Sequence, residues 1–321
     1  MSRQRSPNKG KLHQKRSVHR KKNLRTYSFL VASAILVILI AFSYASSLPK
    51  IEHIPPNFPF FSQSWMQYVP TDAQYVSYIN YEEAYLVSSN TEFFGSEPLL
   101  QLYQIDFRIE PRGVLHEVDV QFSVSQNDVT ANLIKLRNES LVELLKSAEN
   151  STRIFKSSHY GYTIYGLLMR YPKQPQFVLG YLSVVNDYTV VCGEERYGKE
   201  IVERVIDQYV SNSASLFDDY RVRKAVYASG VVNQTLVSLN VGMFPTQLNG
   251  TQMIVKSIVP DTNGIVVTRS LMFPTEDLAS NQFEEAHRVY RNASDYRILG
   301  SYLVVTYRYS VDKLRNELVG T

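Results

Sequence analysis

The segment Gly193-Glu-Glu-Arg-Tyr-Gly198-Lys199-Glu200 matches the spacing of a phosphate-binding loop up to its last position. In such loops backbone amides and a lysine hold nucleotide phosphates, and a Ser or Thr after the lysine binds Mg²⁺. Glu200 cannot replace that hydroxyl, and Glu194 and Glu195 would repel phosphates. We therefore expect a charged turn that leads into a helix, and we predict neither a nucleotide site nor any other cofactor.

Histidines and carboxylates offer one short pairing with the spacing of metal ligands. Glu284 and His287 would share one face of a helix, as in carboxylate metal sites. However, Glu284 and Arg288, at i and i+4, would also form an ordinary surface ion pair. The other candidate histidines are far apart in the sequence: His53, His116 and His159. We predict no metal site, and we expect His116, on an apolar strand face, to be a hydrogen-bonded core histidine.

The side chains that could act as nucleophiles or as general acids have no suitable partner in the sequence. Ser158 and His159 are chain neighbours, so they cannot take the geometry of a catalytic triad. Asp218 and Asp219 are adjacent on an expected helix surface and would point in different directions. Cys192, the single cysteine, ends a hydrophobic stretch and is expected to be a small buried side chain. We predict no catalytic residue.

Five tyrosines crowd into neighbouring segments that are expected to form strands: Tyr160, Tyr162, Tyr165, Tyr171 and Tyr181. Exposed tyrosine rings offer platforms for sugars or for a protein partner. Tyrosine also favours half-buried sheets for reasons of packing alone. A tyrosine binding face is therefore one hypothesis, and ordinary sheet packing is the other.

The chain carries five N-glycosylation sequons, which begin at Asn138, Asn150, Asn233, Asn249 and Asn292. These positions must be exposed if they are glycosylated. The single cysteine excludes an intrachain disulfide, which is unusual for a secreted eukaryotic domain of this size. Together with the 23 tyrosines, these features favour a prokaryotic envelope, bacterial or archaeal, and lean toward an archaeal one.

Alternating hydrophobicity predicts most of the strands. In the segment 114–124, the even-numbered side chains from His116 to Val124 should face a core, and Glu117, Asp119 and Gln121 should face water. The other expected strands are 73–81, 129–136, a hairpin over 177–192 that turns at Asn186-Asp187, 253–259, 265–272 and 302–309. The expected helices are 141–147, capped by Asn138 or Ser140, then 199–209, 213–228, and one that starts at 274–277 and runs through 282–290.

The order of two strands followed by a helix occurs twice in these predictions. A turn at 126–128 joins the first pair of strands, and a turn at 261–264 joins the second pair. The offset between the two units is roughly 137 to 142 residues, which suggests a diverged internal duplication. We therefore predict an α+β fold in which antiparallel sheets are covered by helices, with a duplication as a further hypothesis.

A segment without charged residues, 27–48, is long enough to cross a bilayer as a helix, for which roughly 20 residues suffice. Ten Lys and Arg residues precede it and no Asp or Glu does, which predicts a cytoplasmic N-terminus. The alternative is a cleaved signal peptide, because Ser43-Tyr-Ala45 loosely fits a cleavage site. Without the tail, the formal net charge of +4 becomes −6, so the outer part is mildly acidic.

A proline-rich stalk, 49–68, is expected to follow the membrane segment, because prolines favour extended geometry over helix. Its aromatic residues would rest at the lipid interface or pack under the domain. These residues are Phe58, Phe60, Phe61 and Trp65.

The order of Val69–Ile79, the hairpin, the helix near 199–209 and Ser215–Tyr220 resembles a family of membrane-anchored prokaryotic envelope proteins of unknown function. The resemblance covers residues 69–228. Its opening, Pro70-Thr-Asp72, has one more residue between the proline and the aspartate than the proline-aspartate pair of that family. The resemblance implies a surface location and an α+β architecture, and it supplies no catalytic residues.

These observations predict five parts: a basic cytoplasmic tail (1–26), a transmembrane helix (27–48), the stalk (49–68) and two α+β parts outside the cell (69–230 and 231–321). The function that they favour is non-enzymatic binding or scaffolding at the cell envelope. The partners would be the lipid bilayer and an envelope protein or glycan, and nucleic acid is not expected. The alternatives are an extracytoplasmic hydrolase whose site is assembled from distant residues, and a signalling or assembly subunit that uses its basic tail.

Overall fold

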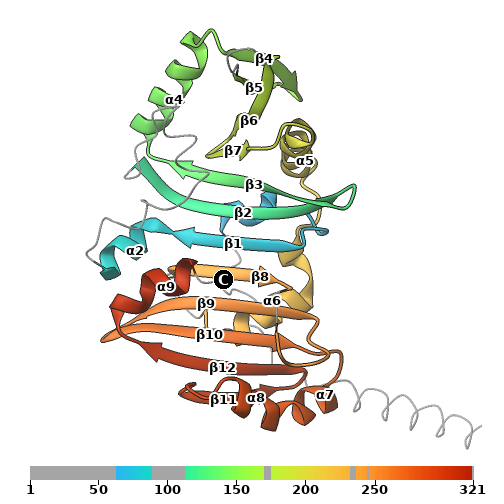
Figure 1. Cartoon of the computed structure of the whole chain (residues 1–321), viewed down its shortest axis with the longest axis vertical. Coiled ribbons are helices and arrows are strands. Elements are labelled where there is room, and N and C mark those ends of the chain that lie inside the picture. The colour runs from blue at the N-terminus through green and yellow to red at the C-terminus, as the bar shows by residue number, and fades with distance from the viewer. Residues whose placement is uncertain (1–62, 89–112, 170–174, 232–235, 244–245, 320–321) are drawn as a thin grey trace, which may run out of the picture. The chain divides into compact units, whose positions relative to one another are not determined.

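The structure, a computed structural model, describes residues 63–88, 113–169, 175–231, 236–243 and 246–319. Within these residues a twelve-stranded antiparallel sheet carries helices on both faces (Figure 1). The α+β fold with a large antiparallel sheet is thus confirmed. No helix in this part of the chain is long and apolar enough to span a membrane, and the predicted segment 27–48 lies outside it.

The strands follow one another in the order β11-β12-β10-β9-β8-β1-β2-β3-β7-β6-β5-β4 across the sheet. Their bounds are β1 Tyr75–Asn80, β2 Val114–Val124, β3 Asn127–Leu136, β4 Ile154–His159, β5 Tyr162–Met169, β6 Phe177–Val185, β7 Tyr188–Cys192, β8 Ser238–Gly242, β9 Met253–Asp261, β10 Gly264–Met272, β11 Asp295–Leu299 and β12 Tyr302–Tyr309. The α-helices are α2 Tyr81–Ser88, α4 Asn138–Asn150, α5 Gly198–Ser211, α6 Tyr220–Ala228, α7 Glu276–Asn281, α8 Phe283–Val289 and α9 Leu314–Val319. Short 3₁₀ helices are η2 Ser64–Tyr68, η5 Leu216–Asp218 and η6 Val311–Lys313.

Several predicted elements are confirmed, among them the strands 114–124 and 302–309, the helix near 199–209 and the hairpin that turns at Asn186. The first hairpin turn differs from the prediction, because Ser125 and Gln126 take left-handed conformations and Asn127 already belongs to β3. Asn and Gly tolerate this conformation best, so the prediction placed Asn127 in the turn, whereas the turn is made by the two residues before it.

Three helix predictions need correction. The N-cap of α4 is Arg137, and it makes no side-chain cap, so neither Asn138 nor Ser140 has the predicted role. The single helix expected from 274–277 through 290 is two short helices, α7 and α8, which meet at Gln282. The segment expected to be helical from Ser213 starts as a loop, and η5 and α6 follow it.

The sheet buries side chains on both faces. One continuous core joins α5 and α6 to the strands, with Val118, Leu133 and Leu239 among its fully buried members. The opposite face has two separate clusters, one under α2 and α4 and one that contains residues of α7, α8 and the C-terminal Leu314. Since both faces are covered, alternation along a strand separates two cores rather than a core from water.

A row of polar side chains runs across this face of the sheet, on directly paired positions of six neighbouring strands. Its members are Arg269, Lys256, Asn240, Ser77, Asp119 and Asn132. Ser77 donates to the Asn240 amide oxygen at 2.9 Å, and Asn132 donates to Asp119. The prediction that Glu117 faces water is wrong, because its carboxylate is buried and accepts a hydrogen bond from the Tyr81 hydroxyl at 2.5 Å.

The described end of the predicted stalk belongs to the folded domain. Trp65, Met66 and Tyr68 of η2 are buried in the continuous core. Of the two roles considered for Trp65, packing in the domain is therefore confirmed. Phe58, Phe60 and Phe61 lie outside the described residues.

The two halves of the sheet repeat the same strand order on either side of the antiparallel pair β1–β8 (Figure 1). One half runs β1-β2-β3-β7-β6 and the other β8-β9-β10-β12-β11. In each half a hairpin is followed by helix, and the last strand of a later hairpin pairs with the second strand of the first. The first half carries the further strands β5 and β4 beyond β6.

Candidate functional site

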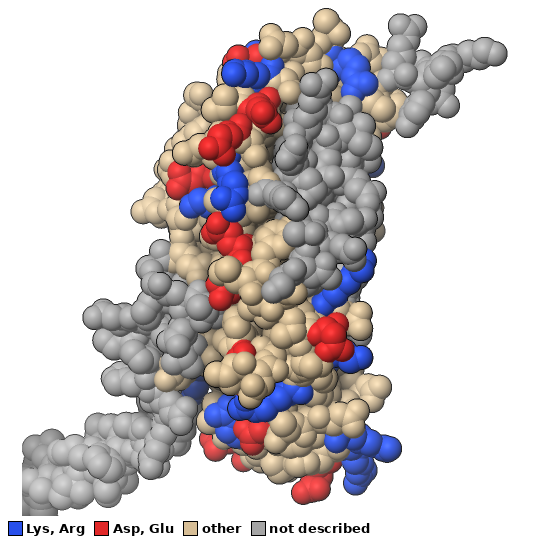
Figure 2. Space-filling model, turned by 90° about the vertical axis from the view of Figure 1, so that its left-hand side faces the viewer, with Lys and Arg blue, Asp and Glu red and all other residues tan. Residues whose placement is uncertain are grey.

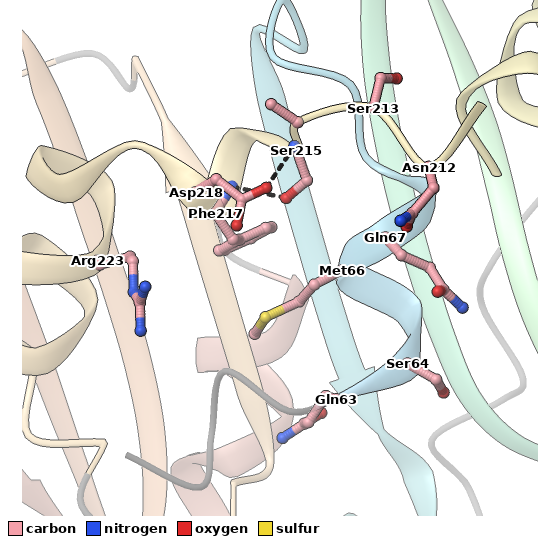
Figure 3. Close-up of a pocket in the computed structure, with 11 residues that line it drawn as sticks. Gln63, Ser64, Met66, Gln67, Asn212, Ser213, Ser215, Phe217, Asp218 and Arg223 are labelled. Atoms are coloured by element: carbon pink, nitrogen blue, oxygen red, sulfur yellow. Dashed lines mark hydrogen bonds between the residues drawn. The ribbon is translucent and has the colours of Figure 1, made fainter. Parts of the chain in front are cut away.

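A cavity of about 440 Å³ lies among η2, the loop after α5, η5 and α6 (Figure 3). Most of the side chains that line it are polar. Six of them are amides or hydroxyls: Gln63, Gln67, Asn212, Ser64, Ser213 and Ser215. The volume is within the range of about 300–1,000 Å³ that is usual for small-molecule sites.

The helix η2 supplies one side of the cavity and is anchored by its tryptophan. Trp65 stacks on Tyr78 of β1, with ring centroids 4.9 Å apart, and meets the ring of Phe217 edge to face at 5.1 Å. The indole Nε1 of Trp65 donates to Gln63 Oε1 at 2.6 Å. Gln63 is thereby fixed at the wall of the cavity, and Gln67 lies on the exposed side of the same helix.

The loop after α5 forms the rim and is held from below by one buried glutamine. Asn212 ends the helix in the left-handed conformation, which asparagine adopts more easily than most residues. The Gln208 Nε2 donates to the carbonyls of Ser213 and Ala214 at 3.0 and 3.3 Å. Its Oε1 accepts from the Ser213 hydroxyl at 2.9 Å. These bonds leave the loop little conformational freedom.

The short helix η5 closes the cavity with a reciprocal cap. The Ser215 hydroxyl accepts from the Phe217 amide at 3.0 Å, and the Asp218 carboxylate accepts from the Ser215 amide at 2.8 Å. The Leu216 amide donates to the Val69 carbonyl at 3.1 Å, which ties this turn to the chain that follows η2. Two segments about 150 residues apart in sequence thus form one wall.

Two opposite charges line the cavity. Figure 3 shows Asp218 and Arg223 on the side of η5 and α6, and Gln63, Ser64 and Gln67 on the side of η2. A carboxylate accepts hydrogen bonds and a guanidinium donates them, so the site offers both functions with no net charge. Such a lining suits the binding of a neutral polar ligand.

The phosphate-loop-like segment does not form a cradle for an anion. The Glu194 carboxylate accepts a hydrogen bond from the Tyr197 backbone amide at 2.5 Å, at the turn before α5. A Cβ on Gly198 would come within 2.9 Å of the Tyr181 ring, so this glycine serves close packing between helix and strand. The segment is the charged turn that its sequence predicts.

The described histidines lie apart from one another and contact different partners. His159 bonds to Asp207 at 2.6 Å on the exposed surface of α5, and His287 stacks on Tyr296 with ring centroids 3.8 Å apart. Burial and, secondarily, Lys135 lower the pKa of His116. The buried Nδ1 of His116 has no hydrogen-bond partner among the described residues, so the hydrogen bond predicted for this histidine is not made at this atom. Among these residues no group of His, Cys, Asp and Glu could hold a metal ion, and His53 lies outside them.

The predicted ion pair between Glu284 and Arg288 is replaced by a different one. Arg288 lies 3.1 Å from Glu285, at i and i−3, on the exposed side of α8. A one-residue change of partner is a small geometric difference on a helix surface, where both spacings bring side chains together.

The remaining candidates for chemistry have structural roles. Cys192 is buried and donates to the Thr130 carbonyl at 3.4 Å, and burial raises the pKa of its thiol to about 12. Asp218 caps η5, and Asp219 accepts from the Arg221 amide at the start of α6. Hydrogen bonds from Arg221 lower the pKa of Asp219. The two carboxylates are thus caps at helix starts, rather than residues on a helix surface as predicted.

The tyrosines proposed as a binding face are divided between the two faces of the sheet. Tyr162 and Tyr181 pack against the core on the side of α5, whereas Tyr165 is buried on the side of α4. Tyr160 is 69% exposed at the turn between β4 and β5. Tyr171 lies outside the described residues. The described tyrosines therefore do not share one surface.

Four of the five sequon asparagines are exposed: Asn138, Asn150, Asn249 and Asn292. Asn233 lies outside the described residues. Figure 2 shows that acidic and basic side chains are interspersed on the face it presents, which offers no broad basic patch among the coloured residues.

The lining of the cavity was not identified from the sequence, because no local motif joins Gln63 and Gln67 to the loop at 212–215. The one usable signal is the Ser215-Leu-Phe-Asp218 pattern, which is typical of a capped helix start. It indicates a turn, but it does not show which distant segment the turn contacts.

No family model matches the chain, and no curated protein matches it. Solved structures of TP0453 are distantly similar to it. Crystal form IV has a TM-score of 0.46 with 12% identity over 79% of this chain and 95% of that chain. Crystal form I has a TM-score of 0.44 with 13% identity over 80% and 97% of the two chains. Similarity at this level supports no conclusion about function.

Proposed function

We propose that the chain is a single-pass, membrane-anchored extracytoplasmic protein that binds or scaffolds a partner at the cell envelope without catalysing a reaction. Residues 1–26 form a cytoplasmic tail, and residues 27–48 cross the membrane. Since residues 63–68 pack in the folded domain, the stalk is shortened to residues 49–62. The two α+β parts lie outside the cell.

One observation carries this proposal: an uncharged apolar segment at 27–48 follows ten basic residues and no acidic ones. A helix of roughly 20 apolar residues spans the hydrocarbon layer, and positive charge before it favours a cytoplasmic N-terminus. The exposed sequon asparagines among the described residues are compatible with an extracytoplasmic domain.

The binding role is supported by the structural roles of the side chains that could otherwise take part in catalysis. The Cys192 thiol is buried with a raised pKa, and the Asp218 and Asp219 carboxylates cap helices. The Glu194 carboxylate binds a backbone amide. The polar cavity presents mostly amides and hydroxyls, which bind ligands well and are weak acids and bases, and its one carboxylate, Asp218, caps η5.

We also propose that the two α+β parts arose by internal duplication. The repeated strand order and the antiparallel β1–β8 pair, in which equivalent strands meet, support this proposal. The two segments that the sequence pattern suggested as repeats, 114–136 and 253–272, form the hairpins β2–β3 and β9–β10, which have equivalent positions in the two halves of the sheet. The sequence pattern of two strands followed by a helix thus agrees with the strand order of the sheet, although neither depends on residue identity.

Protease accessibility on intact cells tests the topology. A tag is placed at the C-terminus, and the size of the membrane-bound species is measured before and after treatment. We expect the tag to be lost from intact cells while a cytoplasmic marker protein stays protected. A tag that is digested only after permeabilisation would place the domain in the cytoplasm and refute the proposal, and a released, untreated domain would show cleavage near Ala45.

A further inference from the structure

We infer that the cavity among η2, η5 and α6 binds a neutral polyhydroxylated ligand, one or two sugar rings in size. The inference names a ligand class for the binding role and rests on the proposed function for the source of that ligand, an envelope glycan.

The lining matches hydroxyl groups in hydrogen-bond type. A sugar hydroxyl donates one hydrogen bond and accepts others, so its best partners present donors and acceptors side by side. Primary amides do this with one group, and Gln63, Gln67 and Asn212 place three of them around the cavity. The Ser64 hydroxyl adds a further hydrogen-bonding group, whereas the Ser213 hydroxyl is already bonded to Gln208 and Ser211.

The charges in the cavity disfavour ionic ligands. Asp218 would repel a phosphate or a carboxylate, and Arg223 would repel an ammonium group. Toward a diol the same two groups are complementary, because the carboxylate accepts from hydroxyls and the guanidinium donates to them. Hydrogen bonds to charged groups contribute roughly 1.5–3 kcal/mol, more than those between neutral groups.

A small apolar area also lines the cavity. Met66 and Phe217 contribute to it, although each side chain is almost completely buried. The C–H groups of a sugar ring can contact this area while its hydroxyls point to the rim. Since the remaining lining is polar, a lipid chain or another fully apolar ligand would leave amides and hydroxyls without partners.

Hydrogen bonds within the protein hold the rim of the cavity in place. Gln208 holds the carbonyls of Ser213 and Ala214, and the cap between Ser215 and Asp218 fixes the turn below them. A site that is ordered in advance loses less conformational entropy on binding, which matters for small ligands with few contacts.

Trp65 provides a direct reporter of binding, because it is the single tryptophan of the chain. It donates to Gln63 and touches Phe217, and both of these residues line the cavity. Full-length protein in lipid nanodiscs, free of glycoside detergents, is titrated with D-glucose, D-mannose, N-acetyl-D-glucosamine and maltose while the Trp65 emission is followed. We expect a saturable change with at least one of them, with a Kd of about 0.1–10 mM.

Variants separate binding in the cavity from other effects. Gln67→Ala and Asn212→Gly, the latter keeping the left-handed conformation, should each weaken binding about three- to tenfold. Gln247→Ala, a change at an exposed glutamine outside the cavity, should leave the Kd within about twofold. Thermal midpoints are measured in parallel to show that each variant folds.

Three results would overturn the inference: no saturable response to any saccharide, equal binding by all variants, or saturation by inorganic phosphate or tetraalanine in place of the sugars. The protease experiment and the saccharide titration can fail independently of each other. An accessible tag without a saccharide response would leave the anchored domain and refute the sugar site. A protected tag with a saccharide response would retain the site and refute the envelope source.

Discussion

The buried ammonium group of Lys256 in β9 lies 3.2 Å from the Glu317 carboxylate of α9 and donates to the Glu317 carbonyl at 2.5 Å. Burial lowers the pKa of Lys256, and Glu317 opposes that shift. Lys256 also belongs to the polar row that runs across this face of the sheet. The C-terminal helix is thus fastened to the sheet by one charge pair as well as by the apolar contact of Leu314.

Glu317→Gln should destabilise the protein by about 2 kcal/mol, because it leaves the buried charge of Lys256 without its counter-ion. The free energy of unfolding, measured in urea, gives the effect. Adding Lys256→Met in the same chain should restore at least half of the loss. Glu285→Gln, which breaks the exposed pair with Arg288, is the matched control and should cost less than about 0.5 kcal/mol. Equal costs at the two sites would show that burial does not strengthen the Lys256 pair.

Gln208→Leu should destabilise the protein by about 2 kcal/mol and loosen the rim of the cavity. The change removes the donor to two backbone carbonyls and the acceptor for the Ser213 hydroxyl, all within the same loop. Hydrogen exchange at the Leu216 and Phe217 amides reports on the loop and should become faster. Gln247→Leu, at an exposed position, should change neither quantity by more than about 0.5 kcal/mol. Unchanged exchange rates in Gln208→Leu would show that the loop is held by other contacts.

Periodicity was sufficient to predict strands that are long and regular. The segments 114–124 and 302–309 were placed correctly, because each alternates or concentrates apolar residues over at least eight positions. β11, with the sequence Asp-Tyr-Arg-Ile-Leu299, is short and polar and was not predicted. It lies at the edge of the sheet, where only β12 pairs with it, so packing demands little of its side chains.

The role of Glu117 could not be deduced, because alternation has the same appearance whether polar residues meet water or a second layer of protein. Only the tertiary structure brings the Tyr81 hydroxyl to its carboxylate. The cavity poses the same difficulty, since the hydrogen bond from Leu216 to Val69 joins segments that share no pattern. Sequence periodicity predicts which face of a strand or helix is buried, but it does not predict which elements pack together. A site built from several loops depends on that packing.

Raising the pH should destabilise the fold from about pH 9 upward. Burial raises the pKa of Tyr302 and Tyr307 to about 12, and it raises the pKa of Tyr68 and Tyr78 as well. A raised pKa in the folded state means that the unfolded chain releases its protons first. The stabilisation is therefore complete below the unfolded pKa of 10.0 and is lost as the pH approaches the folded value.

The contribution of Tyr307 can be isolated. Tyr307→Phe cannot ionise, so its free energy of unfolding should fall by about 1 kcal/mol less than that of the unaltered protein between pH 9 and pH 11. Urea unfolding at both pH values, followed by far-ultraviolet circular dichroism, measures the difference. Tyr160→Phe, a change at an exposed ring, should follow the unaltered protein. If Tyr307→Phe did so too, deprotonation of this buried ring would not contribute to alkaline unfolding.

The pairing of β1 with β8, on which the repeated topology depends, can be tested by a disulfide between Ser77→Cys and Asn240→Cys. These residues are direct partners in the antiparallel pair, and their side chains are hydrogen-bonded at 2.9 Å. Opposed residues in such a pair have Cα atoms about 4.5–5.5 Å apart, within the range that a disulfide bridges. The native Cys192 is buried with a raised pKa and should not compete. We expect mild oxidation to join the β1 and β8 peptides, as shown by mass spectrometry after digestion.

Gln121→Cys with Asn240→Cys is the control, because β2 and β8 lie on opposite sides of β1 and are separated by roughly 10 Å. Cross-linking of the control as fast as of the test pair, or of neither, would contradict the central pairing and with it the proposed duplication.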